Sequence, residues 1–450
     1  MSSPIGPAER PTLGTAARFF WLAIFMVAAD GVILRWWHRE PHYLALAAAF
    51  LALLGLALTP ELRAPLARRG QDQSARLLEA WCAFAILVAS LAFYAVTWSA
   101  DSTPFNALIR QAFAFVHGHV DVDAPYYIEH SLFHGKSYQL HPPLPAVMFI
   151  PFVAIWGMDT NQNILSIITG ALDVALAWRM LARFPLTINA RTWLTVFFGA
   201  GTILWFEAIG GTSWAVSMLV AIMFTLLALD EVFGAARPWL VGLFAALAAL
   251  ARYDLVLVWP IYLLLARVRG RAWRDLAAML PAFALAGFAY VLFNEARYGS
   301  VLDQTEFLFM EKGTQAFGLQ YLPGNIFTIL FMGPVVNGTF PYIHPTFGGQ
   351  AIVLTSPAFL LALRPSFRRA DAALLGVAAM LAAAPSLLYW ANGYAQFGTR
   401  HYLHVFPFLL VLMALGVHRR ADQLTRILIV ASVVLIAFGV WHVQVYGYGS

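Results

Sequence analysis

Residues 77–98 read LLEAWCAFAILVASLAFYAVTW, a run of 22 residues in which Glu79 is the only charged side chain. A helix over this run is about 33 Å long at 1.5 Å per residue, enough to cross the roughly 30 Å hydrocarbon core of a bilayer. Apolar runs of about 18 to 22 residues recur along the chain, of which 61% is hydrophobic and only 11% charged. The sequence therefore predicts an all-α, polytopic transmembrane helical bundle and excludes a soluble domain.

We expect about 13 spans in a single integral membrane domain, residues 1–450. They lie near 18–34, 42–59, 77–98, 161–182, 191–209, 212–232, 238–251, 254–267, 275–294, 350–363, 371–390, 402–418 and 424–445. With the N-terminus inside, 20 of the 28 lysines and arginines fall on the inner side. This bias follows the positive-inside rule, and it explains the net charge of +5 without a nucleic-acid partner. Two large outer loops remain, 99–160 and 295–349.

Two segments decide how the chain is threaded. The run 144–156, LPAVMFIPFVAIW, is too short to cross the bilayer and contains two prolines, so we expect it to lie along the outer interface. The run 238–267 is interrupted by the charged residues Arg252 and Asp254. If it were one helix, the arginine-rich loop that follows would face outward, so we expect two short helices that meet near the outer face.

The single cysteine and the N-terminal residues exclude further classes of protein. The single cysteine, Cys82, lies inside an apolar run, which excludes a disulfide framework and a cysteine-based metal site. The first 20 residues lack the short apolar core and small-residue cleavage site of a secretory signal. We therefore expect the first span to remain as an anchor.

Polar residues gather in the first outer loop. Thr103 and Pro104 form a suitable N-cap and first residue for a helix. The apolar residues that follow, from Phe105 to Val116, repeat at helical spacing, which predicts an amphipathic helix at the interface. Asp101 precedes it directly at the mouth of the third span. It either acts as a general base toward a hydroxyl or only favours the helix N-terminus.

Other acidic and histidine side chains in this loop allow several interpretations. Asp121 and Asp123 share a face if the chain is extended, and they form either a carboxylate pair or a solvated turn. Glu129 precedes His130 and His134, whose spacing of four permits metal chelation on a helix. Because no third ligand is recognisable, we predict no metal site.

Charged residues near the outer membrane surface are the remaining candidates. Arg252 and Asp254 either pair with each other or line a cavity, and Glu207 lies near the outer end of its span. Arg297 and Arg400 flank outer loops. Guanidinium groups bind phosphate bidentately, so these arginines either hold an anionic headgroup or serve as snorkelling anchors.

The segment 134–145, HGKSYQLHPPLP, carries Lys136 and His141 beside three prolines. Proline fixes φ and removes a backbone donor, so an irregular segment of this composition can rest at the interface with few unsatisfied amides. We expect a proline-stiffened shelf that turns its donors toward a lipid phosphate.

Taken together, these motifs resemble the first outer loop of GT-C glycosyltransferases, most closely the branch of protein O-mannosyltransferases and lipid A aminoarabinose transferases. The resemblance covers roughly residues 77–445 and rests on short motifs in the same order. The matching residues are Asp101, Gly135, Lys136, Tyr138, Pro142, Pro143, Leu144 and Gly157, then Asn294, Arg297, Tyr298 and Gly299, and finally Gly398, Arg400, Tyr402 and Pro407.

The resemblance implies a hexosyl- or pentosyltransferase of the bacterial cytoplasmic (inner) membrane, active on the periplasmic or extracellular side. It would move a sugar from a polyprenyl-phosphate donor to a lipid, polysaccharide or protein acceptor, with inversion. No cofactor is firmly implied, although a divalent cation could take part. The alternative from the residues alone is a lipid or solute transporter or flippase, which needs paired broken helices and a midplane site.

The resemblance also implies roles for individual residues. Asp101 would be the catalytic base. Relatives commonly carry Asp-Glu there and a lysine before the two prolines, whereas this chain has Asp101-Ser102 and His141. Asp121, Asp123 and Glu129 therefore remain alternatives for the base. The donor phosphate would be held by Lys136, His141, Arg252, Arg297 and Arg400, and the substrate cavity would include Tyr138, Glu207, Asp254 and Tyr402.

Overall fold

The computed structural model describes residues 9–36, 71–98, 102–123, 130–305, 308, 315–365, 367–391, 393, 396–417 and 419–447; within them, side chains are described outside 29–36 and 71–75. The predicted span 42–59 and the candidate bases Asp101 and Glu129 lie outside the described residues.

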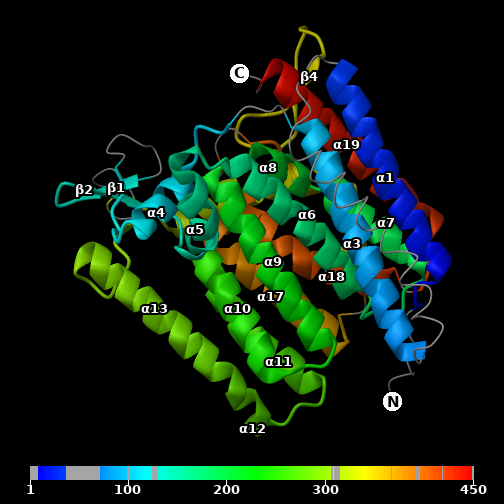
Figure 1. Cartoon of the computed structure of the whole chain (residues 1–450), viewed down its shortest axis with the longest axis horizontal. Helices are drawn as coiled ribbons and strands as arrows, with labels where there is room; N and C mark the ends of the chain where they lie inside the picture. Colours follow the sequence, from blue (N-terminus) through cyan, green and yellow to red (C-terminus); the bar gives the residue numbers. More distant parts are fainter. Residues whose placement is uncertain are drawn as a thin grey trace.

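Helices make up most of the described chain (Figure 1). The α-helices are α1 (Leu13–Trp36), α3 (Gln71–Thr97), α4 (Ala107–Val116), α5 (Leu144–Trp156), α6 (Gln162–Leu181), α7 (Ile188–Ala200), α8 (Leu204–Gly210), α9 (Ser213–Phe233), α10 (Pro238–Ala251), α11 (Trp259–Val268), α12 (Trp273–Leu276), α13 (Leu280–Tyr298), α15 (Leu322–Phe331), α16 (Ile352–Thr355), α17 (Ala370–Leu387), α18 (Phe406–Gly416) and α19 (Gln423–Tyr446). Short 3₁₀ helices are η1 (Gly157–Asp159), η2 (Tyr253–Val258), η3 (Ala277–Met279), η4 (Leu319–Tyr321), η5 (Pro357–Leu363) and η6 (Arg400–Val405).

Six helices of the described chain are long and apolar enough to cross a membrane: Arg76–Thr97 within α3, α6, α9, the α12–α13 run Trp273–Tyr298, α17 and α19. Together α7 and α8 make a seventh candidate, but they are bent by 44°. This composition is consistent with an all-α membrane protein.

The predicted count of about 13 spans is not confirmed. The predicted span 191–209 is the bent pair α7–α8, and 350–363 is divided between α16 and η5. The predicted span 402–418 begins with the 3₁₀ turn η6 and continues as the 11-residue helix α18. Apolar composition alone cannot distinguish one long helix from two short ones, because breaks depend on local backbone geometry.

The chain breaks at Arg252, as the sequence predicts. Helix α10 ends at Ala251, where Arg252 has the extended dihedral angles φ −145° and ψ 108°. The following helix α11 returns to the starting end of α10, because Arg269 donates to the carbonyl of Phe233 at 3.2 Å. The two short helices therefore run in opposite directions, as predicted.

One end of the bundle is held together by ion pairs. Asp230 at the end of α9 pairs with Arg179 at 3.0 Å and with Arg183 at 2.6 Å, both near the end of α6. Arg191 on α7 bonds Glu79 on α3 through both guanidinium nitrogens. These arginines lie on the predicted inner side, so the structure brings that set of turns to one end of the bundle.

The opposite end carries a β-hairpin that the sequence analysis missed. Strands β1 (His130–Phe133) and β2 (Lys136–Gln139) are antiparallel, and they project beside α4 in Figure 1. The two turn residues, His134 and Gly135, have φ values of 50° and 78°. A two-residue hairpin loop with positive φ at both positions matches the twist of its strands.

The hairpin corrects two interpretations. The first half of the predicted irregular shelf, 134–145, is a turn and a strand, and only Leu140 to Pro143 forms an irregular link to α5. His130 lies on a strand and His134 in the turn, so they do not share a helix face as chelation at this spacing would require. A second short hairpin joins β3 (Val335–Val336) and β4 (Ile343–His344).

Helix α4 begins later than predicted. Its N-cap is Asn106, not Thr103. The Thr103 amide instead donates to Asn163 at 2.8 Å, and the carbonyl of Phe105 accepts from Ser213 and Gln162. These contacts tie the approach to α4 to the N-terminal turns of α6 and α9, so tertiary contacts override the local capping preference. The segment 144–156 is a helix, α5, which packs against α4.

Candidate functional site

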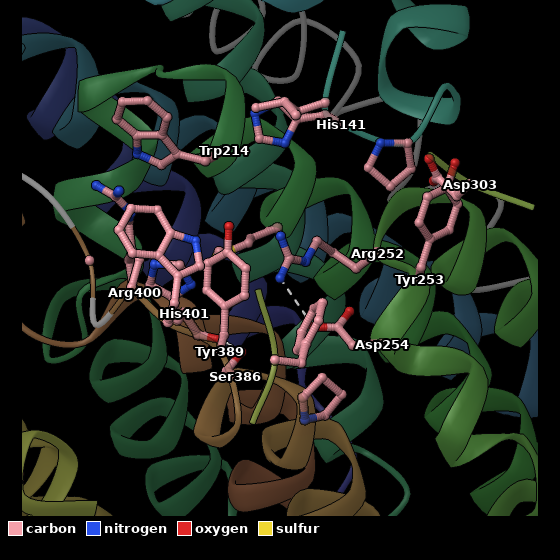
Figure 2. Close-up of a pocket in the computed structure, with 18 of the residues that line it drawn as sticks. His141, Trp214, Arg252, Tyr253, Asp254, Asp303, Ser386, Tyr389, Arg400 and His401 are labelled. Carbon is pink, nitrogen blue, oxygen red and sulfur yellow. Dashed lines mark hydrogen bonds and ion pairs between the residues drawn. The ribbon is translucent and has the colours of Figure 1, made fainter. Parts of the chain in front are cut away.

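A pocket of about 650 Å³ is shown in Figure 2. It lies at the end of the bundle away from the Asp230 ion pairs, because Trp214 lines it from the first turn of α9 and Asp230 lies near the last turn of that helix. Its walls combine aromatic rings with charged side chains from segments that are far apart in sequence. The lining residues are Phe105, Leu140, His141, Pro142, Trp214, Met218, Arg252, Tyr253, Asp254, Leu257, Asp303, Phe317, Pro385, Ser386, Tyr389, Trp390, Ala391, Gly393, Arg400 and His401.

Helix ends and helix breaks position these side chains. Trp214 lies in the first turn of α9, and Arg400 opens η6. Arg252 stands at the break between α10 and η2, where its extended backbone ends the helix. His141 belongs to the link from the hairpin to α5. The pocket therefore forms where the start of α9, the end of α10 and the start of η6 come together.

Arg252 and Asp254 do pair with each other, which was one of the two interpretations of the sequence. Arg252 Nη2 lies 3.1 Å from Asp254 Oδ2, and His404 Nε2 lies 3.1 Å from the same oxygen. His404 is fully buried, and its Nε2 also lies 3.0 Å from the carbonyl of Ala382. Because both residues of the pair line the pocket, the carboxylate fixes Arg252 at the wall of the pocket.

Arg400 forms the second cationic wall. Its guanidinium lies 4.3 Å from the centre of the Trp214 ring, a cation–π contact, and its backbone N–H donates to Gln396 Oε1 at 3.3 Å. His401 follows it, just before the predicted span 402–418. Burial, together with the charges of Arg400 and Arg252, holds the pKa of His401 well below its usual range. His401 is therefore neutral at pH 7, and the two arginines carry the positive charge.

Asp303 lines the pocket, although it was not among the predicted site residues. Its Oδ1 accepts from the Thr305 backbone N–H at 2.9 Å and from the Thr305 hydroxyl, and it lies 3.6 Å from Arg297 Nη2. The side chain of Asp303 is 21% exposed. An acidic residue soon after a span was the signal that drew attention to Asp101, and the same signal would have found Asp303.

Arg297 lies beside the pocket but does not line it. Its side chain is 1% exposed and donates to the carbonyl of Gln139 at 3.2 Å and to Asn294 Oδ1 at 2.6 Å. The guanidinium also stacks on Phe293 at 4.1 Å and on Tyr298 at 4.7 Å. These contacts join the end of β2 to the end of α13, so the structure gives Arg297 a supporting position.

Tyr138 is buried in the same supporting layer, with its ring edge-on to Tyr298 at 5.2 Å. Burial raises the pKa of its hydroxyl. Lys136 lies on the outer part of the hairpin and pairs with Asp121 at 3.1 Å, with 56% of the lysine side chain exposed. Asp123 is exposed. Tyr138, Tyr298 and the three charged residues Lys136, Asp121 and Asp123 all lie outside the pocket lining.

Two further predicted cavity residues, Glu207 on α8 and Tyr402 on η6, are buried but do not line the pocket. Of the predicted phosphate-binding residues, the structure brings His141, Arg252 and Arg400 together and leaves Lys136 and Arg297 outside. Asp254 is the predicted cavity residue that reaches the pocket.

In the described ranges, no group of three or more His, Cys, Asp or Glu side chains could hold a metal ion. Comparisons with models of protein families, with curated proteins and with solved structures found no match.

Proposed function

We propose that this protein is a membrane glycosyltransferase that moves a sugar from a polyprenyl-phosphate donor to an acceptor, and that the pocket is its active site. The observation that carries the proposal is the meeting of Arg252 and Arg400 with His141 in one pocket walled by aromatic rings. About 300–1,000 Å³ is usual for a small-molecule site, and this pocket holds about 650 Å³.

The charge of the pocket suits a phosphate leaving group. A polyprenyl-phosphate sugar is a phosphodiester with one negative charge, and release of the polyprenyl phosphate leaves two. Cations that are fixed in advance stabilise charge as it develops in the transition state. Arg252 is held by Asp254 at 3.1 Å and Arg400 by its contact with Trp214, so both are positioned before a ligand binds.

The rim of the pocket suits a lipid-borne donor. Leu257 lines the pocket and is 44% exposed, and its neighbour Val256 is 52% exposed. Both belong to η2, which continues into the apolar helix α11. An isoprenoid chain could lie against this apolar surface while its phosphate enters the pocket. A nucleotide sugar has no apolar chain to cover the same surface.

Further parts of the proposal follow from the resemblance to GT-C enzymes. Transfer takes place at the outer face of a bacterial inner membrane and inverts the anomeric carbon. Asp101 is the base that the resemblance implies. Among its alternatives, Asp121 is paired with Lys136 and Asp123 is exposed outside the pocket.

A transporter or flippase is the second candidate, and the bend of 44° between α7 and α8 favours it. Broken helices of this kind line substrate sites in transporters, where they occur in corresponding positions of two halves. The pocket of this protein lies at the ends of other helices, which favours the enzyme.

Purified protein in lipid nanodiscs, given a mixture of polyprenyl-phosphate sugars and cell-envelope acceptors, tests the proposal. We expect sugar transfer by the wild type and a loss of about 100-fold in Arg400→Ala, the scale on which removal of one transition-state donor acts. The control is Arg274→Ala, since Arg274 is 89% exposed at the other end of the bundle. Lipid movement across vesicles by a wild type that transfers no sugar would favour the transporter.

A further inference from the structure

We propose that Asp303, in place of the Asp101 that the resemblance implies, accepts the proton of the acceptor hydroxyl or amine during transfer, an assignment that rests on the proposed function. Among the residues that the structure describes, the pocket lining contains two carboxylates, Asp254 and Asp303. Asp254 uses Oδ2 to hold both Arg252 and His404, each at 3.1 Å. A carboxylate oxygen that already contacts both an arginine and a histidine is a poor proton acceptor, because protonation would disturb both contacts.

The position of Asp303 relative to the arginines fits an inverting displacement. Figure 2 shows Arg400 and Asp303 at opposite sides of the pocket, with the guanidinium of Arg252 between them in this view. In a displacement with inversion, the nucleophile approaches the anomeric carbon from the side opposite the leaving group. A sugar whose phosphate lies against the arginines would therefore turn its open face toward Asp303.

The surroundings of Asp303 hold its carboxylate in a defined orientation. Thr305 donates to Oδ1 from both its backbone and its hydroxyl, and Tyr290 hydrogen-bonds the same side chain. Arg297 Nη2 lies 3.6 Å from the same Oδ1 and adds a positive charge beside the carboxylate. A general base needs this combination of fixed position and negative charge.

The hydrogen bonds around Asp303 continue into the hairpin. The Thr305 hydroxyl lies 2.8 Å from the Tyr298 hydroxyl, which lies 3.3 Å from Ser131 Oγ on β1. The hairpin therefore supports the loop that carries Asp303 although it does not itself line the pocket. This gives the hairpin, Arg297 and Tyr298 a positioning role in the same site.

The proposed step balances in atoms and charge. The acceptor O–H or N–H proton moves to a carboxylate oxygen of Asp303, and the acceptor lone pair forms the bond to the anomeric carbon. The bond from that carbon to the phosphate oxygen breaks, and its electron pair leaves with the polyprenyl phosphate. The proton on Asp303 then passes to solvent, to which the side chain is 21% exposed.

The test compares Asp303→Asn with Asp159→Asn, a matched change at an exposed carboxylate in the first outer loop outside the pocket. We expect kcat of Asp303→Asn to fall by about 10²- to 10⁴-fold, the usual contribution of a general base. The KM for the donor should change by less than about threefold, because donor contacts are retained. The acid limb of the pH–rate profile should disappear in this variant and persist in the control.

Thr305→Val serves as a second variant, because it keeps the carboxylate and removes one donor to it. We expect a smaller fall in kcat with an unchanged pH profile, and equal elution on size exclusion shows that each variant is folded. Transfer by Asp303→Asn within about threefold of the wild type would overturn the assignment. So would an acid limb that persists in Asp303→Asn and disappears in Asp101→Asn. A wild type that transfers no sugar would instead remove the proposed function, and the assignment with it.

Discussion

Asp254 shows how a charge is kept inside an apolar bundle. Its carboxylate lies between Arg252 and His404, and its side chain is 7% exposed. Burying an ion is costly unless partners and hydrogen bonds replace water. The chain supplies these partners from two distant segments, the 252–254 break and η6.

Removing this anion should destabilise the protein more than removing a surface one. We expect Asp254→Asn to lower the free energy of unfolding by about 3–5 kcal/mol, because it leaves the guanidinium of Arg252 without its anionic partner inside the bundle. Thermal unfolding in detergent measures the effect. The matched control is Asp275→Asn, whose pair with Arg274 is exposed; a change of about 0–1 kcal/mol is expected there. Equal losses in both variants would contradict this account.

At the scale of elements, close packing of short helices holds the site together. Helix α10 is only 14 residues long, yet it contacts α9, α11, α13 and η3. Gly242 permits one of these approaches, since a Cβ there would lie 2.7 Å from the Cα and carbonyl oxygen of Met279. The backbone of η3 therefore packs directly on α10, which carries Arg252 at its other end.

A methyl group at position 242 should push α10 and η3 apart. We expect Gly242→Ala to destabilise the protein by about 1–3 kcal/mol. The new methyl group would overlap backbone atoms of Met279, which cannot move away by a side-chain rotation. Gly287→Ala on α13 is the control, since a Cβ there meets open space and alanine favours helix. Thermal unfolding of both variants checks the prediction, and a neutral Gly242→Ala would show that η3 can move away.

The hairpin illustrates what local sequence reasoning overlooks. Prolines drew attention to 134–145 as an irregular shelf, whereas the turn depends on His134 and Gly135 at positive φ. His-Gly is a weak hairpin signal compared with Asn-Gly. Burial of Tyr138 and the bond from Arg297 to the carbonyl of Gln139 support the strands from α13, and these contacts are invisible in the segment itself.

At the scale of the whole molecule, the two ends of the bundle differ in chemistry. One end carries Asp230 and Glu231 with their arginine partners, and the other carries the pocket and the hairpin. The sequence predicts that the arginine-rich end faces the cytoplasm. The proposed sugar transfer would then take place at the outer surface.

Cysteine labelling in intact cells tests this orientation. The single native cysteine, Cys82, is buried, so Cys82→Ser gives a background without thiols. We expect a membrane-impermeant thiol reagent to label Asp159→Cys from outside and Arg274→Cys only after permeabilisation, because both positions are exposed at opposite ends. The reverse pattern would invert the predicted topology and place the pocket on the cytoplasmic side.

The sequence by itself determined the helical class, the ends of α10 and α5, and the reversal at Arg252, because apolar run length, proline and buried charge act locally. It also identified His141, Arg252, Asp254 and Arg400 as candidates. Only the tertiary structure decided that these four meet, that Asp303 joins them, and that Lys136 and Arg297 do not line the pocket. The physical reason lies in the partners of the arginines. An arginine close to a carboxylate, a carbonyl or an aromatic ring is held there, and such a partner can be far away along the chain, as Trp214 is from Arg400.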